Sequence, residues 1–317
     1  MTMEASSKRG SISRLIEENK RKSKYKQGMV EKSVPVFLFI MAIISIFTTI
    51  GIVITLMVET VTFFNRVPIL EFITSMEWFP FFEADPQYGI APLISGTLLV
   101  AVIAMLVAVP IGLATAIYLS EYASDRVRRI VKPILEVLAG IPTIVYGFFA
   151  LTFVTPMLQK IVPDLQFFNA LSPGIVVGIM IIPMIASLSE DAMGAVPRSM
   201  REGALALGST KLEVSLKVVV PAALSGIIAS FVLGISRAIG ETMIVTIAGG
   251  SSPNLTFNPA ETIQTMTAYI VQVSLGDASY GSTIYYSIYA VGMTLFVFTL
   301  LMNIIAQLIS KRFREEY

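Results

Sequence analysis

Long stretches without any charged residue set the main constraint on how this chain can fold. A helix rises 1.5 Å per residue, so about 20 apolar residues cross the roughly 30 Å hydrocarbon core of a bilayer. Five uncharged runs reach the required length: Val34–Val58, Gly89–Leu119, Val137–Gln159, Leu165–Ser189 and Ala278–Ser310. A sixth apolar stretch begins near Val218 and is interrupted by Arg237 and Glu241. We therefore predict an all-α membrane protein, a bundle of six transmembrane helices.

The composition supports a membrane protein and excludes several kinds of chemistry. Only 14% of the residues are charged, whereas an average soluble domain carries about 25%. The sequence contains no cysteine and no histidine. Disulfides, metal sites built from these residues and catalytic arrangements that need either of them are therefore excluded. We expect no catalytic residues and no metal site.

The distribution of lysine and arginine predicts the orientation in the membrane. Basic residues concentrate in cytoplasmic segments, and here twenty of the 23 fall in segments that six spans would place on one side. Both termini are therefore expected in the cytoplasm. The predicted organisation is a basic tail over residues 1–33, a six-span domain over 34–310 and a short tail over 311–317. The basic segments are the first tail, residues 126–132, residues 198–217 and the last seven residues.

The segment from Arg198 to Pro221 is a charged loop rich in small residues. Gly208 permits a sharp turn, with a positive φ angle, between two short helices. Ala204 gives the loop a low profile that fits a partner's groove. Pro221 suits the first turn of the following helix, where no N–H donor is needed. The loop is expected to be a cytoplasmic docking surface; the alternative is an ordinary amphipathic loop.

The spacing within this loop resembles the signature of binding-protein-dependent ABC importer permeases. That signature is Glu-Ala-Ala, three residues, Gly, nine residues and Ile-x-Leu-Pro; the chain has Glu202-Gly203-Ala204, then Gly208, then Val218-Val219-Val220-Pro221. Gly203 in place of alanine weakens the first short helix by up to about 1 kcal/mol. The resemblance implies that separate ATPase subunits dock on this coupling loop, residues 198–221. Its implied site residues are Arg201, Glu202, Gly203, Ala204, Gly208 and Pro221.

Other segments look like phosphate-transport permeases, most closely the PstC-type permease of Pst importers. They are Leu135–Gly147, Ser189–Ala192 and Ser236–Met243. The resemblance implies the type I ABC importer permease fold. It also implies a second, PstA-like permease, two PstB-like ATPase subunits and an external PstS-like phosphate-binding protein. Phosphate and membrane lipid are the other expected partners, and nucleic acid is not one.

The chain itself is expected to be a transporter subunit without its own ATPase site. Gly203 to Thr210 superficially resembles a P-loop, but Ser209 stands where the phosphate-binding lysine is required. No cofactor is therefore expected on this chain. ATP and Mg²⁺ would be bound by the partner ATPase subunits.

Arg237 and Glu241 are the charged residues inside the sixth apolar stretch. Their spacing places them on one face of a helix, about 6 Å apart along its axis. An unpaired charge near the bilayer centre costs at least about 2.5–3.5 kcal/mol, so neither should face lipid. We predict that both line the translocation path, where the planar donors of arginine suit phosphate oxygens. Glu241 could hold Arg237, accept a hydrogen bond from protonated phosphate, or weaken binding. The alternative is a mutual ion pair that only locks the bundle.

Two further groups carry weaker expectations. The aromatic cluster from Trp78 to Phe82 is expected at the membrane interface, with an external docking surface as the alternative. Glu190 and Asp191 are expected at the cytoplasmic boundary, paired with Arg198 or Arg201.

The predicted function is a permease subunit of an ATP-driven inorganic phosphate importer that forms half of the translocation path. The closest alternative is a permease for another oxyanion or small solute. An ATP-independent secondary transporter or channel would work without ATPase partners. An integral membrane enzyme would need convergent catalytic groups beyond one Arg–Glu pair.

Overall fold

The computed structural model describes the backbone of residues 2–82 and 84–312. Side chains are described from Ser33 onward within this range, except at positions 277, 306 and 309–312. The expected C-terminal tail, 311–317, therefore lies largely outside the described residues. The chain divides into two units, residues 1–58 and 59–317. Each unit is described by itself.

The first unit is formed by most of helix α1 (Thr2–Phe64). This helix includes both the basic segment and the first uncharged run, so it is not interrupted at residue 33, where the tail was predicted to end. In the part from Ser33 to Phe64, none of the most apolar 18-residue window is buried. Large apolar side chains such as Phe37 and Phe47 are exposed. An apolar surface of this kind needs a cover of lipid or packed protein.

Among the described residues, four helices are long and apolar enough to cross a membrane alone, and two bent helix pairs bring the total to six. Besides α1, the straight spans are α3 (Ala91–Ile117) with its π-helical extension η1 (Tyr118–Tyr122), α7 (Leu171–Gly194) and α14 (Thr283–Arg312). One bent pair joins α4 (Asp125–Gly140) at 87° to the segment α5 (Thr143–Phe149), η2 (Ala150–Val154) and α6 (Thr155–Gln159). The other joins Lys211–Ala222 at 72° to α11 (Leu224–Ile239). The predicted number of spans is reached only if each bent pair counts as one.

The third predicted run, Val137–Gln159, is not a single straight helix. Helix α4 ends at Gly140, and Ile141 adopts an extended conformation with ψ 129°. A residue before proline disfavours the α conformation, so Pro142 explains the break. Helix α4 also starts earlier than the apolar run, because the Ser124 side chain accepts a hydrogen bond from the Val127 N–H and caps it. The basic segment at residues 126–132, which lies between two predicted spans, is therefore helical.

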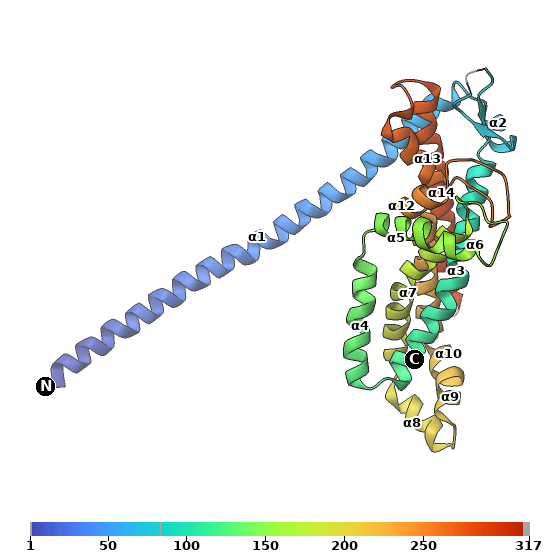
Figure 1. Ribbon diagram of the computed structural model, residues 1–317. Coiled ribbons are helices and arrows are strands. Elements are labelled where there is room, and N and C mark those ends of the chain that lie inside the picture. Colours follow the sequence, from blue (N-terminus) through green and yellow to red (C-terminus); the bar gives the residue numbers. More distant parts are fainter. Residues whose placement is uncertain (1, 83, 313–317) are drawn as a thin grey trace. The chain divides into compact units, whose positions relative to one another are not determined.

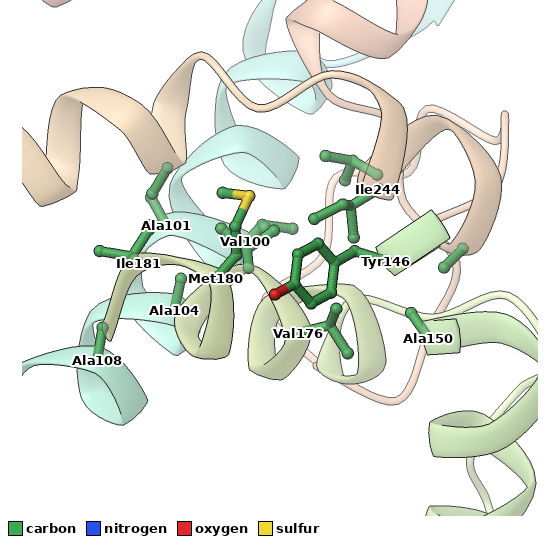
Figure 2. Close-up of a cluster of buried hydrophobic side chains, with 14 of the residues drawn as sticks. Val100, Ala101, Ala104, Ala108, Tyr146, Ala150, Val176, Met180, Ile181 and Ile244 are labelled. Atoms are coloured by element: carbon green, nitrogen blue, oxygen red, sulfur yellow. The ribbon is translucent and has the colours of Figure 1, made fainter. Parts of the chain in front are cut away.

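Helices α3 and α7 pack closely because small residues occur where they meet. A Cβ atom on Gly178 of α7 would lie 2.7 Å from the carbonyl oxygen of Ala104 on α3. On α3, a Cβ atom on Gly112 would lie 2.8 Å from the side chain of Ile185. Small residues of this kind let helix backbones approach each other within membranes. Figure 2 shows the resulting core, in which Tyr146 of α5 and Ile244 of α12 (Met243–Ala248) complete the cluster.

One end of the second unit is closed by an aromatic cluster. Helix α2 (Ile69–Thr74) precedes two antiparallel two-residue strands, β1 (Trp78–Phe79) and β2 (Gln87–Tyr88). Trp78 is 0% exposed and packs edge-on against Phe72, Tyr88 and Tyr269 of α13 (Met266–Gln272), which continues into η4 (Val273–Asp277). Trp78 is thus part of the core, whereas Phe79, Phe81 and Phe82 are exposed.

The opposite end of the second unit carries a helical hairpin (Figure 1). It contains α8 (Arg198–Ala206), α9 (Lys211–Val214), the π-helical segment η3 (Ser215–Val219) and α10 (Val220–Ala222). We refer to residues 198–222 as the hairpin. A small core that includes Met193, Val214 and Ile227 attaches it to the spans.

Candidate functional site

The turn of the hairpin has the geometry that the glycine spacing predicts. Gly208 has φ +88°, a value that residues with a Cβ atom rarely adopt. Helix α9 then begins with a capping box: the Thr210 side chain accepts from the Glu213 N–H, and the Glu213 carboxylate accepts from the Thr210 N–H. The sharp turn between two short helices is therefore confirmed.

The outer surface of the hairpin exposes several leucine side chains. Leu207 is 90% exposed, and Leu205 and Leu212 are also exposed. Glu202 and Gly203 are exposed as well, and a Cβ atom added to Gly203 would meet nothing within 4 Å. Exposed apolar side chains gathered on one feature are typical of protein interaction sites. The hairpin therefore presents a group of uncovered leucine side chains.

Arg201 lies in the hairpin but its guanidinium group points into the protein. Its Nη2 donates to Glu121 Oε1 at 3.0 Å and to the Met193 carbonyl at 2.7 Å, and its Nη1 donates to the Val196 carbonyl at 2.6 Å. The two side chains are only 19% and 9% exposed. Arg201 thereby fastens α8 to the end of α7 and to η1. The sequence grouped Arg201 with the docking residues and gave no indication of Glu121, which is 80 positions away.

Pro221 lies directly before the 72° bend between Lys211–Ala222 and α11. It is the middle residue of the three-residue helix α10, which follows the π-helical segment η3. Ala223 then leaves the helical conformation with φ −91° and ψ 4°, and α11 begins at Leu224. Because proline supplies no N–H donor, it interrupts the helical hydrogen-bond ladder of Lys211–Ala222 directly before the bend.

Arg237 and Glu241 do not share a helix. Helix α11 ends at Ile239 with Gly240 as its C-cap, and α12 begins at Met243. The expectation of two side chains on one continuous helix face is therefore wrong. Although both residues lie in the described part of the chain, the structure forms no ion pair between them.

Glu241 instead stabilises the start of the next helix. Its Oε1 accepts a hydrogen bond from the Ile244 N–H at 3.3 Å, and its backbone carbonyl accepts one from the Thr267 hydroxyl at 2.7 Å. The Glu241 residue is 6% exposed. A negative charge is favourable where the first N–H groups of a helix are unpaired. Glu241 thus holds the broken span in shape.

Arg237 is exposed on the surface of this isolated chain. Its Nη2 lies 3.8 Å from the Met180 sulfur on α7. The neighbouring Ser236 donates to Asn303 of α14 at 2.8 Å, which fixes this end of α11. The bend at Ala223 changes the direction of the helix axis. The position of Arg237 along its span is therefore counted from Leu224, and it lies about 20 Å along α11 from that residue.

Glu190 is fully buried and is neutralised by helix α4. Arg128 forms an ion pair with its Oε1, and Lys132 Nζ lies 2.8 Å from its Oε2. Asp191 is 3.7 Å from the same lysine. The predicted partners, Arg198 and Arg201, are therefore wrong. Arg128 and Lys132 are four residues apart and share a face of α4, a helix that Ser124-Asp125 at its start could have signalled.

The structure combines two bent spans, a break between α11 and α12, and a hairpin at one end of the bundle. The chain belongs to the family described as the binding-protein-dependent transport system inner membrane component, which it matches over residues 108–315. It is a multi-pass inner membrane protein and the permease subunit of an ABC importer. Such permeases work with ATPase subunits and a binding protein, and they lack ATPase activity themselves.

The chain is similar to several described permeases. It is 36% identical to the probable ABC transporter permease protein YqgH of Bacillus subtilis, with 86% of this chain and 88% of that protein covered. It is 36% identical to the phosphate transport system permease protein PstC of Xylella fastidiosa, with coverages of 77% and 79%. For the probable PstC of Methanocaldococcus jannaschii the identity is 34%, with coverages of 80% and 87%.

Solved ABC importers share the fold. A bacterial alginate ABC transporter, solved in complex with its alginate-bound periplasmic protein, matches 87% of this chain and 94% of its own with a TM-score of 0.61 and 17% identity. The inward-facing MetNI methionine transporter matches 72% of this chain and 95% of its own, with a TM-score of 0.53 and 18% identity. At these identities the likeness shows the fold alone.

Proposed function

We propose that this chain is the permease subunit of an ATP-driven inorganic phosphate importer and forms half of its translocation path. Support comes from the phosphate transport permeases among its relatives, which align with most of the chain. In this proposal a second, PstA-like permease completes the path, two PstB-like subunits hydrolyse ATP, and an external PstS-like protein delivers phosphate. Both termini and the hairpin lie in the cytoplasm.

The observation that carries the proposal is that Arg237 is exposed and has no acidic partner among the described residues. Its charge lies within an apolar span, on a surface of the chain that is exposed in the isolated subunit, and Glu241 does not neutralise it. A guanidinium group facing lipid would be costly. We infer that this surface faces the second permease across the path. Arginine stays protonated at any relevant pH, and its fork of N–H donors suits phosphate oxygens.

We assign Glu241 to the same path in a different role from Arg237. Because its carboxylate caps α12, it fixes the break at Gly240–Thr242 that ends α11 just beyond Arg237. Its negative charge close to the break would also limit how tightly an anion binds there. A translocation path needs binding weak enough for the substrate to leave.

We propose the hairpin as the coupling loop to the ATPase subunits. Glu202, Gly203 and Ala204 would form the contact surface, together with the exposed leucine side chains beside them. Three other residues would set the shape of the hairpin. Arg201 would attach it to the spans, Gly208 would form its turn and Pro221 would mark the bend at its end. ATP binding would then favour one conformation of the permease by moving the hairpin.

Phosphate uptake by the reconstituted complex tests the proposal. Vesicles containing both permeases, the ATPase subunits and the binding protein should accumulate labelled phosphate only with ATP, and excess sulfate should not compete. Arg237→Gln should abolish uptake while the ATPase subunits still co-purify, because the substitution removes the charge and leaves the hairpin unchanged. Arg126→Gln, the same substitution on an exposed face of α4, should transport normally.

Three results would contradict the proposal. Normal uptake by Arg237→Gln would remove this residue from the path. Competition by sulfate equal to that by phosphate would favour a permease for another oxyanion. Uptake without any ATPase subunit would indicate a secondary transporter or channel.

A further inference from the structure

A pocket of about 360 Å³ lies where the hairpin meets the spans. Its walls come from η1, α4, the end of α7, α8 and α9, which converge at one end of the second unit (Figure 1). Its volume falls in the range of about 300–1,000 Å³ typical of small-molecule sites. Its polar lining residues are Ser120, Glu121, Arg128, Arg198, Arg201 and Lys211.

The charges that line this pocket do not balance. Four of the lining side chains are cationic and only Glu121 is anionic. Glu121 is already satisfied, because it accepts hydrogen bonds from Arg201 at 3.0 Å and from the Ser120 hydroxyl at 2.9 Å. Arg128 is paired with Glu190 outside the pocket. The two remaining cations are Arg198 and Lys211.

Arg198 and Lys211 have no acidic partner among the side chains that the structure describes. Neither forms an ion pair with any residue that the structure describes. Lys211 Nζ lies 5.6 Å above the ring of Tyr122, a contact that leaves its N–H donors unused. The two side chains start from different helices, α8 and α9, and line the same pocket. An anion placed between them would find donors on both sides.

We propose that this pocket binds a phosphate group, supplied either by free phosphate or by the headgroup of an anionic lipid. Arginine presents planar paired donors to phosphate oxygens, and lysine adds a compact positive charge. Basic pockets between membrane helices on the cytoplasmic side are suited to lipid headgroups. The cytoplasmic location rests on the proposed orientation, whereas the pocket and its charges do not.

Binding at this site would link the hairpin to the rest of the permease. The phosphate group would contact Arg198 of α8 and Lys211 of α9 on one side and lie next to Arg128 of α4 on the other. Arg128 already ties α4 to α7 through Glu190. An occupied pocket would therefore restrain movement of the hairpin relative to two spans.

The test measures phosphate-group binding to the whole purified transporter, without its external binding protein, in the Arg237→Gln background. That background removes the proposed path site and separates the two proposals. One arm uses nanodiscs of phosphatidylcholine and titrates labelled inorganic phosphate. The other arm compares phosphatidylglycerol with phosphatidylcholine and measures retained lipid by native mass spectrometry. Saturable binding is expected in at least one arm and identifies the source.

A matched pair of double variants tests the location. Arg198→Gln with Lys211→Gln should weaken binding at least about tenfold, the effect of losing a charge-assisted hydrogen bond. Arg126→Gln with Lys160→Gln removes the same charges outside both the pocket and the hairpin and should retain binding, since both side chains are exposed. Co-purification of the ATPase subunits and an unchanged melting temperature confirm that both double variants fold.

Three outcomes would overturn the proposal. One is the absence of saturable binding in both arms. Another is an equal loss of binding in the two double variants, which would indicate a diffuse effect of surface charge. The third is a cross-link from Arg198→Cys to an acidic segment of an ATPase subunit in the absence of any bound phosphate group, which would make the pocket a protein contact.

Discussion

Arg201 joins three elements through one guanidinium group. It bonds to Glu121 of η1 and to two backbone carbonyl groups at the end of α7. Both charged side chains are largely buried, so removing one leaves the other with unmet hydrogen-bonding capacity. The attachment of the hairpin therefore depends on this pair more than on any exposed ion pair.

We predict that Arg201→Gln lowers the free energy of unfolding by about 2 kcal/mol, the cost of stranding a partly buried charged group. Glu121→Gln should have a similar effect, and the double variant should cost clearly less than the sum of the two. Denaturant unfolding in detergent measures all three. Strict additivity would show that the two side chains act independently.

Glu213 gives the hairpin a dependence on pH. The hydrogen bond from the Thr210 N–H, followed by the contacts with Lys217 and the Thr210 hydroxyl, lowers the pKa of Glu213 from 4.5 to about 2. A lowered pKa in the folded state means that the ionised form is the one stabilised. The contribution of ionised Glu213 to the stability of the folded state is complete above pH 4.5 and is lost as the pH falls towards 2.

We therefore expect the capping box of α9 to persist to lower pH than an ordinary glutamate would allow. The side-chain carbon resonance of Glu213, assigned by its absence in Glu213→Gln, should titrate with a midpoint near 2. A midpoint near 4.5 would show that the box does not form.

At the scale of elements, the hairpin contains two glycines with opposite requirements. Gly208 needs its positive φ angle, whereas Gly203 lies within helix α8 and has free space around it. Gly203→Ala should stabilise α8 by up to about 1 kcal/mol. Gly208→Ala should strain the turn by about 1 kcal/mol or more.

The paired substitutions also predict a difference in coupling. Gly208→Ala changes the relative direction of α8 and α9, so it should reduce co-purification of the ATPase subunits and ATP-driven uptake. Gly203→Ala should leave both intact or improve them. Equal effects of the two substitutions would contradict the role of the turn.

The elements that could be predicted from the sequence are those set by local chemistry. Gly208 marks a turn because few other residues adopt its conformation, and the long uncharged runs mark spans because charge is costly in lipid. The break after Ile239 was not foreseen, because the four-residue spacing of Arg237 and Glu241 also fits one continuous helix. The pairing of Glu190 with Arg128 was missed because it depends on a tertiary contact between α4 and α7.

At the scale of the whole molecule, the hairpin and the aromatic cluster lie at opposite ends of the second unit (Figure 1). The proposed orientation puts the hairpin end in the cytoplasm and the aromatic end outside. The sequence contains no cysteine, so single cysteines can report orientation without background. In right-side-out vesicles an impermeant maleimide should label Ser252→Cys and leave Ser199→Cys unlabelled until the membrane is opened. Both native serines are exposed. The reverse pattern would invert the proposed topology.

The buried position of Trp78 has a practical consequence for studying the assembled transporter. The chain contains one tryptophan, and that residue is enclosed by rings from α2, β2 and α13 at the end of the unit away from the hairpin. Ultraviolet emission excited at the indole band therefore originates from a single known position in this subunit. With tryptophan-free versions of the other components, the chain carries its own optical probe of events at that end.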